Sequence, residues 1–474
     1  MKTLRLYNSD GRELQEFKPL VSGHAGLYCC GPTVYNYAHI GNLRAYTHWD
    51  ILRRTLERFG YEVKHVMNIT DVGHLTDDGD EGEDKMLKGA RERDMSVWEI
   101  AEFFTRAFFK DIERLNILTP TVSCKATEHI DDMIALVKRL EERGFTYESG
   151  GNIYFDSGKL PDYGRMALLD RQNLQHGARV AVDTNKHSPL DFVLWFTKSK
   201  FENQAMMWDS PWGRGYPGWH IECSAMSSKY LGERIDIHTG GIDHIPVHHT
   251  NEIAQSEGAF GHHWVNYWIH NEFLIMKEGK MSKSKGGFLT LQKLIDDGYE
   301  ALDYRYFLLG GHYRSQLIFS EKSLDGARSA RKSLLGRVAG FKREIDGSPL
   351  PAVIDLGSAS LSRLEAFDEA LGEDLNTPRA LAELWQLVKD ETIPAAERLA
   401  AVLDMDGVLG LNLAEAGEET AGAGEDDKLS ALLTRRKEAR EARNWAAADE
   451  IRDELAEMGW KVVDTPEGPR LEKA

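Results

Sequence analysis

The spacing of apolar residues changes several times along this 474-residue chain, and each change predicts a different kind of element. Short apolar runs alternate with amphipathic stretches through about residue 130, and again from about 206 to 260. The amphipathic stretch Leu43 to Arg58, followed by the apolar run Val63 to Ile69, is one such pair. This alternation predicts a parallel α/β domain made of residues 1–130 and 206–260 and divided by an insertion.

The residues between the two halves, 131–205, carry a different pattern. The stretches 150–156 and 191–195 read as strands, so we expect a separate inserted module here. After the second half, residues 261–325 combine an apolar strand at Phe273–Met276 with a lysine-rich loop and a short helical region. We treat 261–325 as one further region.

The C-terminal third is predicted to be helical. Apolar residues recur at helical spacing from Lys322 to Leu413, for example at Leu381, Leu384, Trp385 and Val388, which indicates an all-α helix bundle over 326–413. Residues 414–427 are small and acidic, without apolar anchors, and are typical of a flexible linker. A small last module occupies 428–474.

The apolar content and the charge of the chain are ordinary for a soluble enzyme. Four cysteines, two of them adjacent, do not make a disulfide framework, and no span of about 20 apolar residues occurs. We therefore expect a cytoplasmic protein that is neither secreted nor inserted in a membrane. The net charge of −18 is unusual for a nucleic-acid partner, but the local surface decides such binding.

Two short signatures carry candidate chemistry. The first, His39-Ile40-Gly41-Asn42, follows a strand and a turn and opens the amphipathic stretch, so it is expected at a helix N-terminus, which favours phosphate. The second, Lys280-Met281-Ser282-Lys283-Ser284, places lysines close together, where they repel each other unless an anion lies among them. Together the two signatures indicate ATP chemistry.

A metal site is the third candidate. His248 and Glu252 are four residues apart and share a face if they are helical. With Cys30 and Cys223 they make a plausible four-coordinate zinc set. Spacing does not select this set, because His244, His249 and Cys29 are equally available.

The order of the two signatures resembles that of the class I aminoacyl-tRNA synthetases, whose catalytic domain is of Rossmann type. The stretches 30–35, 219–227 and 248–255 extend the resemblance to the cysteinyl-tRNA synthetase family, and 444–455 with 464–468 resemble that family's anticodon-binding end. One position departs from the class pattern. Asn42 stands where histidine is usual, and an amide hydrogen-bonds a phosphate without carrying positive charge.

The resemblance implies one zinc ion per chain, which takes the thiolate of the substrate as a further ligand and so excludes serine and alanine. The implied zinc ligands are Cys30, Cys223, His248 and Glu252. The residues implied around the bound L-cysteine are Gly31, Thr70, Trp219 and His220.

The resemblance also implies that ATP with Mg²⁺ is a substrate and that tRNA(Cys) is the macromolecular partner of a monomeric enzyme. The nucleotide-binding residues would be His39, Gly41, Asn42 and Lys283. Charge on the transferring phosphate would be stabilised by His39, Lys280 and Lys283.

The sequence allows two roles for the last module and two rival functions for the chain. Arg436, Arg440 and Arg443 share one side of a predicted helix, which suits contact with RNA but equally suits a solvated helix. One rival is a cysteine ligase acting on a small amino-sugar acceptor, and the other is a non-catalytic tRNA-binding paralogue. The acidic run 73–85 reads as a solvated loop rather than a calcium site.

Overall fold

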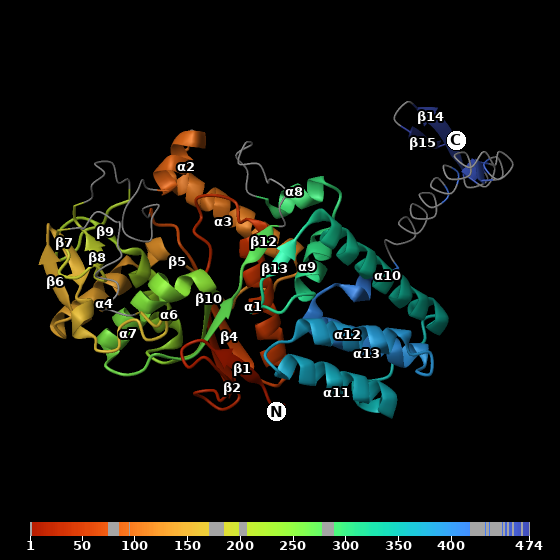
Figure 1. The fold of residues 1–474 in the computed structure, drawn as a ribbon, viewed down its shortest axis with the longest axis horizontal. Coiled ribbons are helices and arrows are strands. Elements are labelled where there is room, and N and C mark those ends of the chain that lie inside the picture. Colours follow the sequence, from red (N-terminus) through yellow and green to blue (C-terminus); the bar gives the residue numbers. More distant parts are fainter. Residues whose placement is uncertain are drawn as a thin grey trace.

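The computed structural model describes residues 2–73, 85–93, 95–169, 184–198, 206–276 and 289–417, and scattered positions between 432 and 473. Its centre is a five-stranded parallel sheet in the order β11-β10-β3-β4-β5. These strands span Val265–Asn271 (β11), Ile235–Gly241 (β10), His24–Cys29 (β3), Glu62–Ile69 (β4) and Val122–Lys125 (β5). The parallel α/β fold predicted from the sequence is confirmed (Figure 1).

Helices cover both faces of this sheet, which explains why its strands are apolar nearly throughout. One face packs on α1 (Ile40–Arg58), and α2 (Lys85–Arg93) and α3 (Val97–Arg114) belong to the same apolar core. The other packs on α4 (Ile130–Glu142), α6 (Trp219–Leu231) and α7 (Thr250–Phe260). Because side chains alternate along a strand, Cys29 belongs to the first core and Cys30 to the second.

The inserted module is a four-stranded antiparallel sheet in the order β6-β7-β8-β9. Its strands are Thr146–Ser149, Asn152–Phe155, Phe192–Phe196 and Tyr216–Pro217. Two details differ from the ranges expected from the sequence. The last strand of the module, β9, comes from beyond residue 205 because it pairs with β8. The strand β11 of the central sheet comes from beyond residue 260 because it pairs with β10.

Short elements connect the sheet to a helix bundle. A hairpin, β1 (Arg5–Asn8) with β2 (Glu13–Glu16), precedes β3. The strands β12 (Leu274–Met276) and β13 (Leu317–Phe319) pair in parallel. Between them in sequence lie α8 (Leu291–Asp296) and α9 (Ala301–Leu309). The predicted bundle follows as α10 (Glu321–Ile345), α11 (Ser358–Gly372), α12 (Thr377–Lys389) and α13 (Ala395–Leu409).

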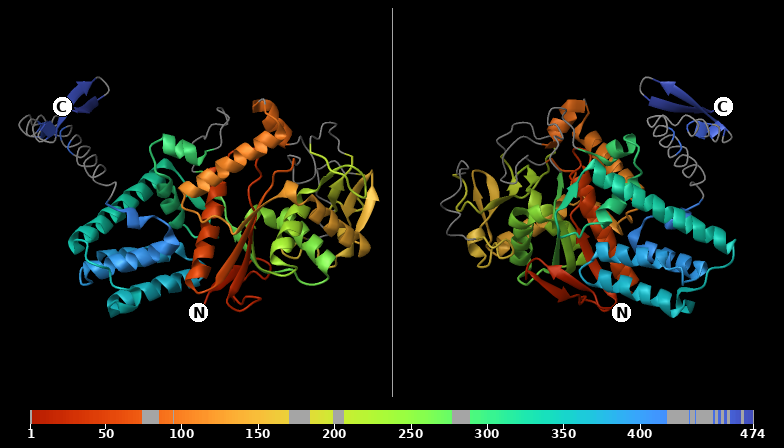
Figure 2. Two further views of the ribbon diagram at one scale, coloured as in Figure 1. Left: turned by 180° about the vertical axis from the view of Figure 1, so that it is seen from behind. Right: turned by 45° about the vertical axis from the view of Figure 1, so that its right-hand side comes forward.

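The inserted sheet and the bundle lie at opposite ends of the molecule, with the central sheet between them (Figures 1 and 2). A buried guanidinium joins the bundle to the centre. Arg305 on α9 contacts Asp50 of α1 at 2.6 Å and donates to the carbonyls of Leu115, Asn116 and Leu409. Within the described ranges, none of the helices combines the length and apolar character needed to cross a membrane.

The last module is described only in part. Leu432, Ile451 and Leu455 form a small apolar cluster beside the hairpin β14 (Trp460–Thr465) and β15 (Gly468–Lys473). Arg436 is 9% exposed, so it differs from the exposed stripe expected from the sequence. Arg440 and Arg443 lie outside the described residues.

Candidate active site

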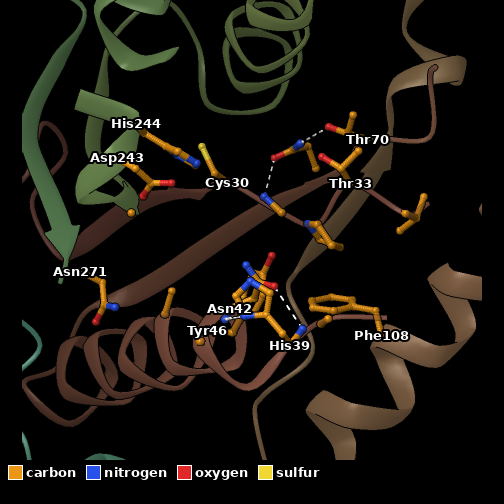
Figure 3. Close-up of a pocket in the computed structure, with 18 of the residues that line it drawn as sticks. Cys30, Thr33, His39, Asn42, Tyr46, Thr70, Phe108, Asp243, His244 and Asn271 are labelled. Atoms are coloured by element: carbon orange, nitrogen blue, oxygen red, sulfur yellow. Dashed lines mark hydrogen bonds between the residues drawn. The ribbon is translucent and has the colours of Figure 1, made fainter. Parts of the chain in front are cut away.

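A cavity of about 550 Å³ opens at the carboxyl edge of the central sheet. It lies where β3 has its sequence neighbour β4 on one side and β10 on the other, the switch point at which open parallel sheets bind ligands. Cys30, Gly31 and Thr70 reach it from the ends of β3 and β4, and Asp243 and His244 from beyond β10 (Figure 3). His39, Gly41 and Asn42 line it from the start of α1.

The backbones of β3 and β4 approach closely at Gly31. A Cβ atom on Gly31 would lie 1.6 Å from the carbonyl oxygen of Asn68, so only glycine fits. The Gly31 amide donates to the Asn68 side chain at 2.8 Å. Gly31 therefore shapes the floor of the cavity.

His39 and Asn42 hold each other at the start of α1. The Asn42 amide donates to Nδ1 of His39, and the His39 amide donates to the Asn42 side chain, both over 3.2 Å. This reciprocal pair is a capping box. An added Cβ on Gly41 would lie 3.0 Å from the His39 ring, so the ring packs directly over that glycine.

The electrostatics of His39 suit a neutral hydrogen-bond donor. Burial lowers the pKa of His39, against the opposing influence of the Asp243 charge. A neutral ring that accepts at Nδ1 carries its proton on Nε2. The sequence predicted a role for His39, and the capping box explains which of its ring nitrogens carries the proton.

Four buried side chains form a candidate metal centre. The ligand atoms of Cys30, Cys223, His248 and Glu252 all lie within 4.8 Å of one another. Cys223 comes from α6, Glu252 from α7, and His248 from the π-helical turn Ile245–His249 that precedes α7. A π turn is a local irregularity that is frequent at functional sites.

Two overlapping groups meet the same distance criterion. One joins Cys30 to His244, His248 and His249, and the other joins it to His238, His249 and Glu252. Geometry therefore keeps His244 and His249 as alternatives, as the sequence did. Cys29 belongs to none of these groups among the described residues, because it faces the opposite core.

Glu252 fits a metal ligand best. Its Oε2 contacts Nε2 of His238 at 2.6 Å. Its Oε1 lies 2.6 Å from Nε2 of His248, yet no donor among the described residues hydrogen-bonds it. A buried carboxylate oxygen that crowds an imidazole nitrogen without a hydrogen bond is what a shared cation would explain.

Burial and neighbouring groups shift the pKa values of the side chains in this cluster. Burial raises the pKa of the Cys30 thiol well above its usual range, whereas a hydrogen bond from Cys30 lowers the pKa of Cys223. Burial alone would lower the pKa of His248, but Glu252 and the contact with Cys223 raise it to about 10. Burial works to raise the pKa of Glu252, but His238 and His248 hold it well below its usual range.

Of the four residues expected around the amino acid, Gly31, Thr70 and Trp219 line the cavity, and His220 is not among its lining residues. The Trp219 ring lies 4.8 Å from the His248 ring, measured between centroids, and Trp219 lines the cavity. His220 contacts Nδ1 of His248 at 2.9 Å from behind. Gly31 and Thr70 form the adjoining wall.

Sequence reasoning named His249 as an alternative ligand but missed the line of contacts that continues from it to His270 and Ser9. Nε2 of His249 lies 3.4 Å from the Cys30 sulfur, and its Nδ1 contacts His270 at 2.7 Å. His270 in turn contacts Ser9 at 2.7 Å. The histidine-rich run from His238 to His249 was a visible signal, but His270 comes from the neighbouring strand β11 and only the sheet brings it close.

Lys280 and Lys283 lie outside the described residues, but both flanks of their segment are described. Leu274 lines the cavity before it, and the Ile40 amide donates to the Leu289 carbonyl after it at 2.9 Å. The segment 277–288 therefore leaves and rejoins the described structure beside the cavity. Most of the acidic run, residues 74–84, also lies outside the described residues.

Comparisons with known proteins agree with this geometry. The model of the class I (C) tRNA synthetase catalytic domain matches residues 16–329, a DALR domain matches 366–414, and the anticodon-binding domain of cysteinyl-tRNA ligases matches 423–468. In solved structures, the methionyl-tRNA synthetase of Mycobacterium tuberculosis bound to methionyl-adenylate shares the fold. Its TM-score is 0.56 at 16% identity, over 90% of this chain and 96% of that one.

Curated relatives match over their whole length. The cysteine–tRNA ligase of Treponema denticola is 55% identical over 98% of both chains. Cysteine–tRNA ligase 1 of Burkholderia lata is 49% identical over 99% of this chain and 96% of its own. The cysteine–tRNA ligase of Borreliella burgdorferi is 44% identical over 99% of both. With its class I catalytic domain and its matched anticodon-binding domain, the chain belongs to the cysteinyl-tRNA ligase family of class I aminoacyl-tRNA synthetases.

Proposed function

We propose that the cavity joins L-cysteine to ATP as cysteinyl-adenylate, and that the cysteinyl group then passes to the terminal ribose of tRNA(Cys). The carboxylate of cysteine attacks the α-phosphate of Mg-ATP, and pyrophosphate leaves. The observation that carries the proposal is a shared cavity: Cys30, Cys223 and His248 line the same space as the capped start of α1. A thiol-selective end and a phosphate-binding end therefore adjoin.

The metal centre is proposed as a zinc site with Cys30, Cys223, His248 and Glu252 as ligands. Two thiols, one imidazole and one carboxylate are typical zinc donors, and among the described residues Oε1 of Glu252 has no hydrogen bond, although it lies 2.6 Å from Nε2 of His248. A zinc ion bound there would take the substrate thiolate as a further ligand. Selection by a required polar contact reaches about 10⁴ to 10⁵, so hydrolytic editing is unnecessary.

The phosphate end is proposed to work by position and charge. The start of α1 supplies the positive end of the helix dipole, and Nε2 of His39 supplies a donor to the α-phosphate as negative charge develops on it. Lys283, with Lys280, would neutralise the same charge from the 277–288 segment. No covalent enzyme intermediate is needed.

Neither rival function is favoured. An amino-sugar ligase would not need the anticodon-binding domain that matches residues 423–468. A non-catalytic paralogue is supported only by Asn42, and that residue takes part in positioning His39.

Exchange of pyrophosphate with ATP tests adenylate formation. The expected result is exchange that depends on L-cysteine and is at least about 10³-fold slower with L-serine. Absence of cysteine-dependent exchange would contradict the proposal. Charging of tRNA(Cys) then separates it from the amino-sugar ligase.

A further inference from the structure

A line of hydrogen bonds runs along one wall of the cavity, from Gly31 through Asn68 and Thr70 to Glu222. The Gly31 amide donates to Oδ1 of Asn68 at 2.8 Å, and Nδ2 of Asn68 donates to the Thr70 hydroxyl at 3.1 Å. The Thr70 hydroxyl in turn donates to Oε2 of Glu222 at 3.0 Å. Glu222 is fully buried, and Asn68 and Thr70 are each 2% exposed.

The direction of every bond in this line is fixed by chemistry. A backbone amide only donates, so the Asn68 oxygen must face Gly31 and its NH₂ group must face Thr70. A carboxylate accepts, so the Thr70 proton points at Glu222. One dashed line in Figure 3 ends on the Thr70 hydroxyl and marks the bond from the asparagine.

The Thr70 hydroxyl therefore has one lone pair left to bond a group in the cavity. It has one proton and two lone pairs, of which the proton goes to Glu222 and one lone pair goes to Asn68. The remaining lone pair can only accept a hydrogen bond. Since Thr70 lines the cavity, this position suits a cationic donor and disfavours an acceptor.

We propose that Glu222 is a positioning residue for amino-acid recognition: it holds the Thr70 proton so that Thr70 presents an acceptor to the α-ammonium group of the substrate. The inference rests on amino-acid activation as the function of this cavity. Glu222 precedes Cys223 on α6, so one helix would serve both ends of the amino acid: Cys223 the thiol, and Glu222, through Thr70, the ammonium.

The proposal distinguishes an ammonium-bearing thiol from one that lacks the ammonium. L-Cysteine and 3-mercaptopropionate share the thiol and the carboxylate, and differ only in the α-amino group. In Glu222→Gln the side chain keeps its shape but loses its charge, and its amide can turn an NH₂ group toward Thr70. The affinity for L-cysteine is expected to fall about tenfold or more, while that for 3-mercaptopropionate changes less than about twofold.

Calorimetric titration of the full-length, metal-loaded protein with both compounds measures this selectivity. Glu257→Gln is the matched control, because the half-buried Glu257 on α7 is ion-paired with Arg165 and does not line the cavity, and it should retain wild-type selectivity. If Glu222→Gln does not fold, Thr70→Val removes the acceptor itself and should show the same selective loss.

Two results would overturn the inference. Equal weakening of both compounds in Glu222→Gln or Thr70→Val would give these residues a merely structural role. Unchanged selectivity in a folded variant would show that the ammonium group binds elsewhere. A wild-type protein that binds neither compound would instead overturn the proposed function and this inference with it.

Discussion

At the scale of single residues, the site depends on small groups held in fixed orientations. Asn42 illustrates this, since its side chain accepts from the His39 amide while its own amide donates to the His39 ring. The position that departs from the class pattern thus holds His39 in place through neutral hydrogen bonds. Positive charge at residue 42 is not part of that role.

Asn42→His should therefore leave cysteine-dependent adenylate formation within about tenfold of wild type. An imidazole at this position can still accept from the His39 amide, so the change is worth about one hydrogen bond. Pyrophosphate exchange measures the rate. A larger loss or gain would mean that the site requires the amide itself.

At the scale of elements, two buried groups make testable contributions to stability, His65 on β4 and Arg305 on α9. His65 lies on β4, is 2% exposed, and neither ring nitrogen has a hydrogen bond among the described residues. Burial, with a contribution from Arg53, lowers the pKa of His65 to about 3. Arg305 joins α9 to α1 through a salt bridge to Asp50 in which neither side chain is exposed.

His65 predicts a loss of stability in acid. Below about pH 6.5 the unfolded chain binds a proton at this residue and the folded chain does not, down to a pH of about 3. His65 therefore makes its full contribution to the free energy of unfolding above about pH 6.5, and about 2 kcal/mol of this contribution is lost at pH 5. His65→Phe should reduce the difference in unfolding free energy between pH 7.5 and 5 by that amount. The control is His24→Gln, a substitution at an exposed histidine, which should leave this difference unchanged. If the free energy of unfolding depends on pH equally in both variants, the role given to His65 is wrong.

Arg305→Met should lower the free energy of unfolding by about 3 kcal/mol, because it leaves the buried Asp50 carboxylate and three backbone carbonyls short of a donor. Urea denaturation followed by circular dichroism measures the change. The control is Arg106→Met, whose exposed ion pair with Glu102 is worth less than about 1 kcal/mol. Similar losses in both variants would count against this role.

Periodicity predicted the sheet and the bundle because strands and helices repeat locally. It did not place β11 in the sheet, because the pairing of Ile237 with Tyr267 depends on tertiary structure and leaves no local sequence pattern. Alternation along β3 decides that Cys30 rather than Cys29 faces the cavity, once the strand is known. The bonds from Thr70 to Glu222 and from His249 to His270 join residues far apart in sequence, so no local pattern contains them.

At the scale of the whole molecule, activation and tRNA recognition occupy different parts of the chain. The cavity lies in the part matched by the catalytic model, residues 16–329, and the anticodon-binding model matches 423–468. Because 76 acidic residues outnumber 58 basic ones, RNA contacts depend on locally basic positions, and these should be sensitive to charge reversal.

Arg440→Glu combined with Arg443→Glu should lower kcat/KM for tRNA(Cys) at least about tenfold, with pyrophosphate exchange unchanged. Two charge reversals at a phosphate contact weaken binding, and the defect should shrink as salt rises. Aminoacylation assays at two ionic strengths measure both effects. Normal charging would show that these arginines form a solvated face.

The central claim is that the sulfur of the incoming amino acid bonds to a metal held by Cys30, Cys223, His248 and Glu252. Its most direct test is the near-ultraviolet absorption of the protein loaded with Co²⁺ in place of zinc, titrated with L-cysteine. The account predicts that the sulfur-to-cobalt charge-transfer band grows to saturation with L-cysteine and does not respond to L-serine. A band that stays unchanged while L-cysteine binds would contradict it.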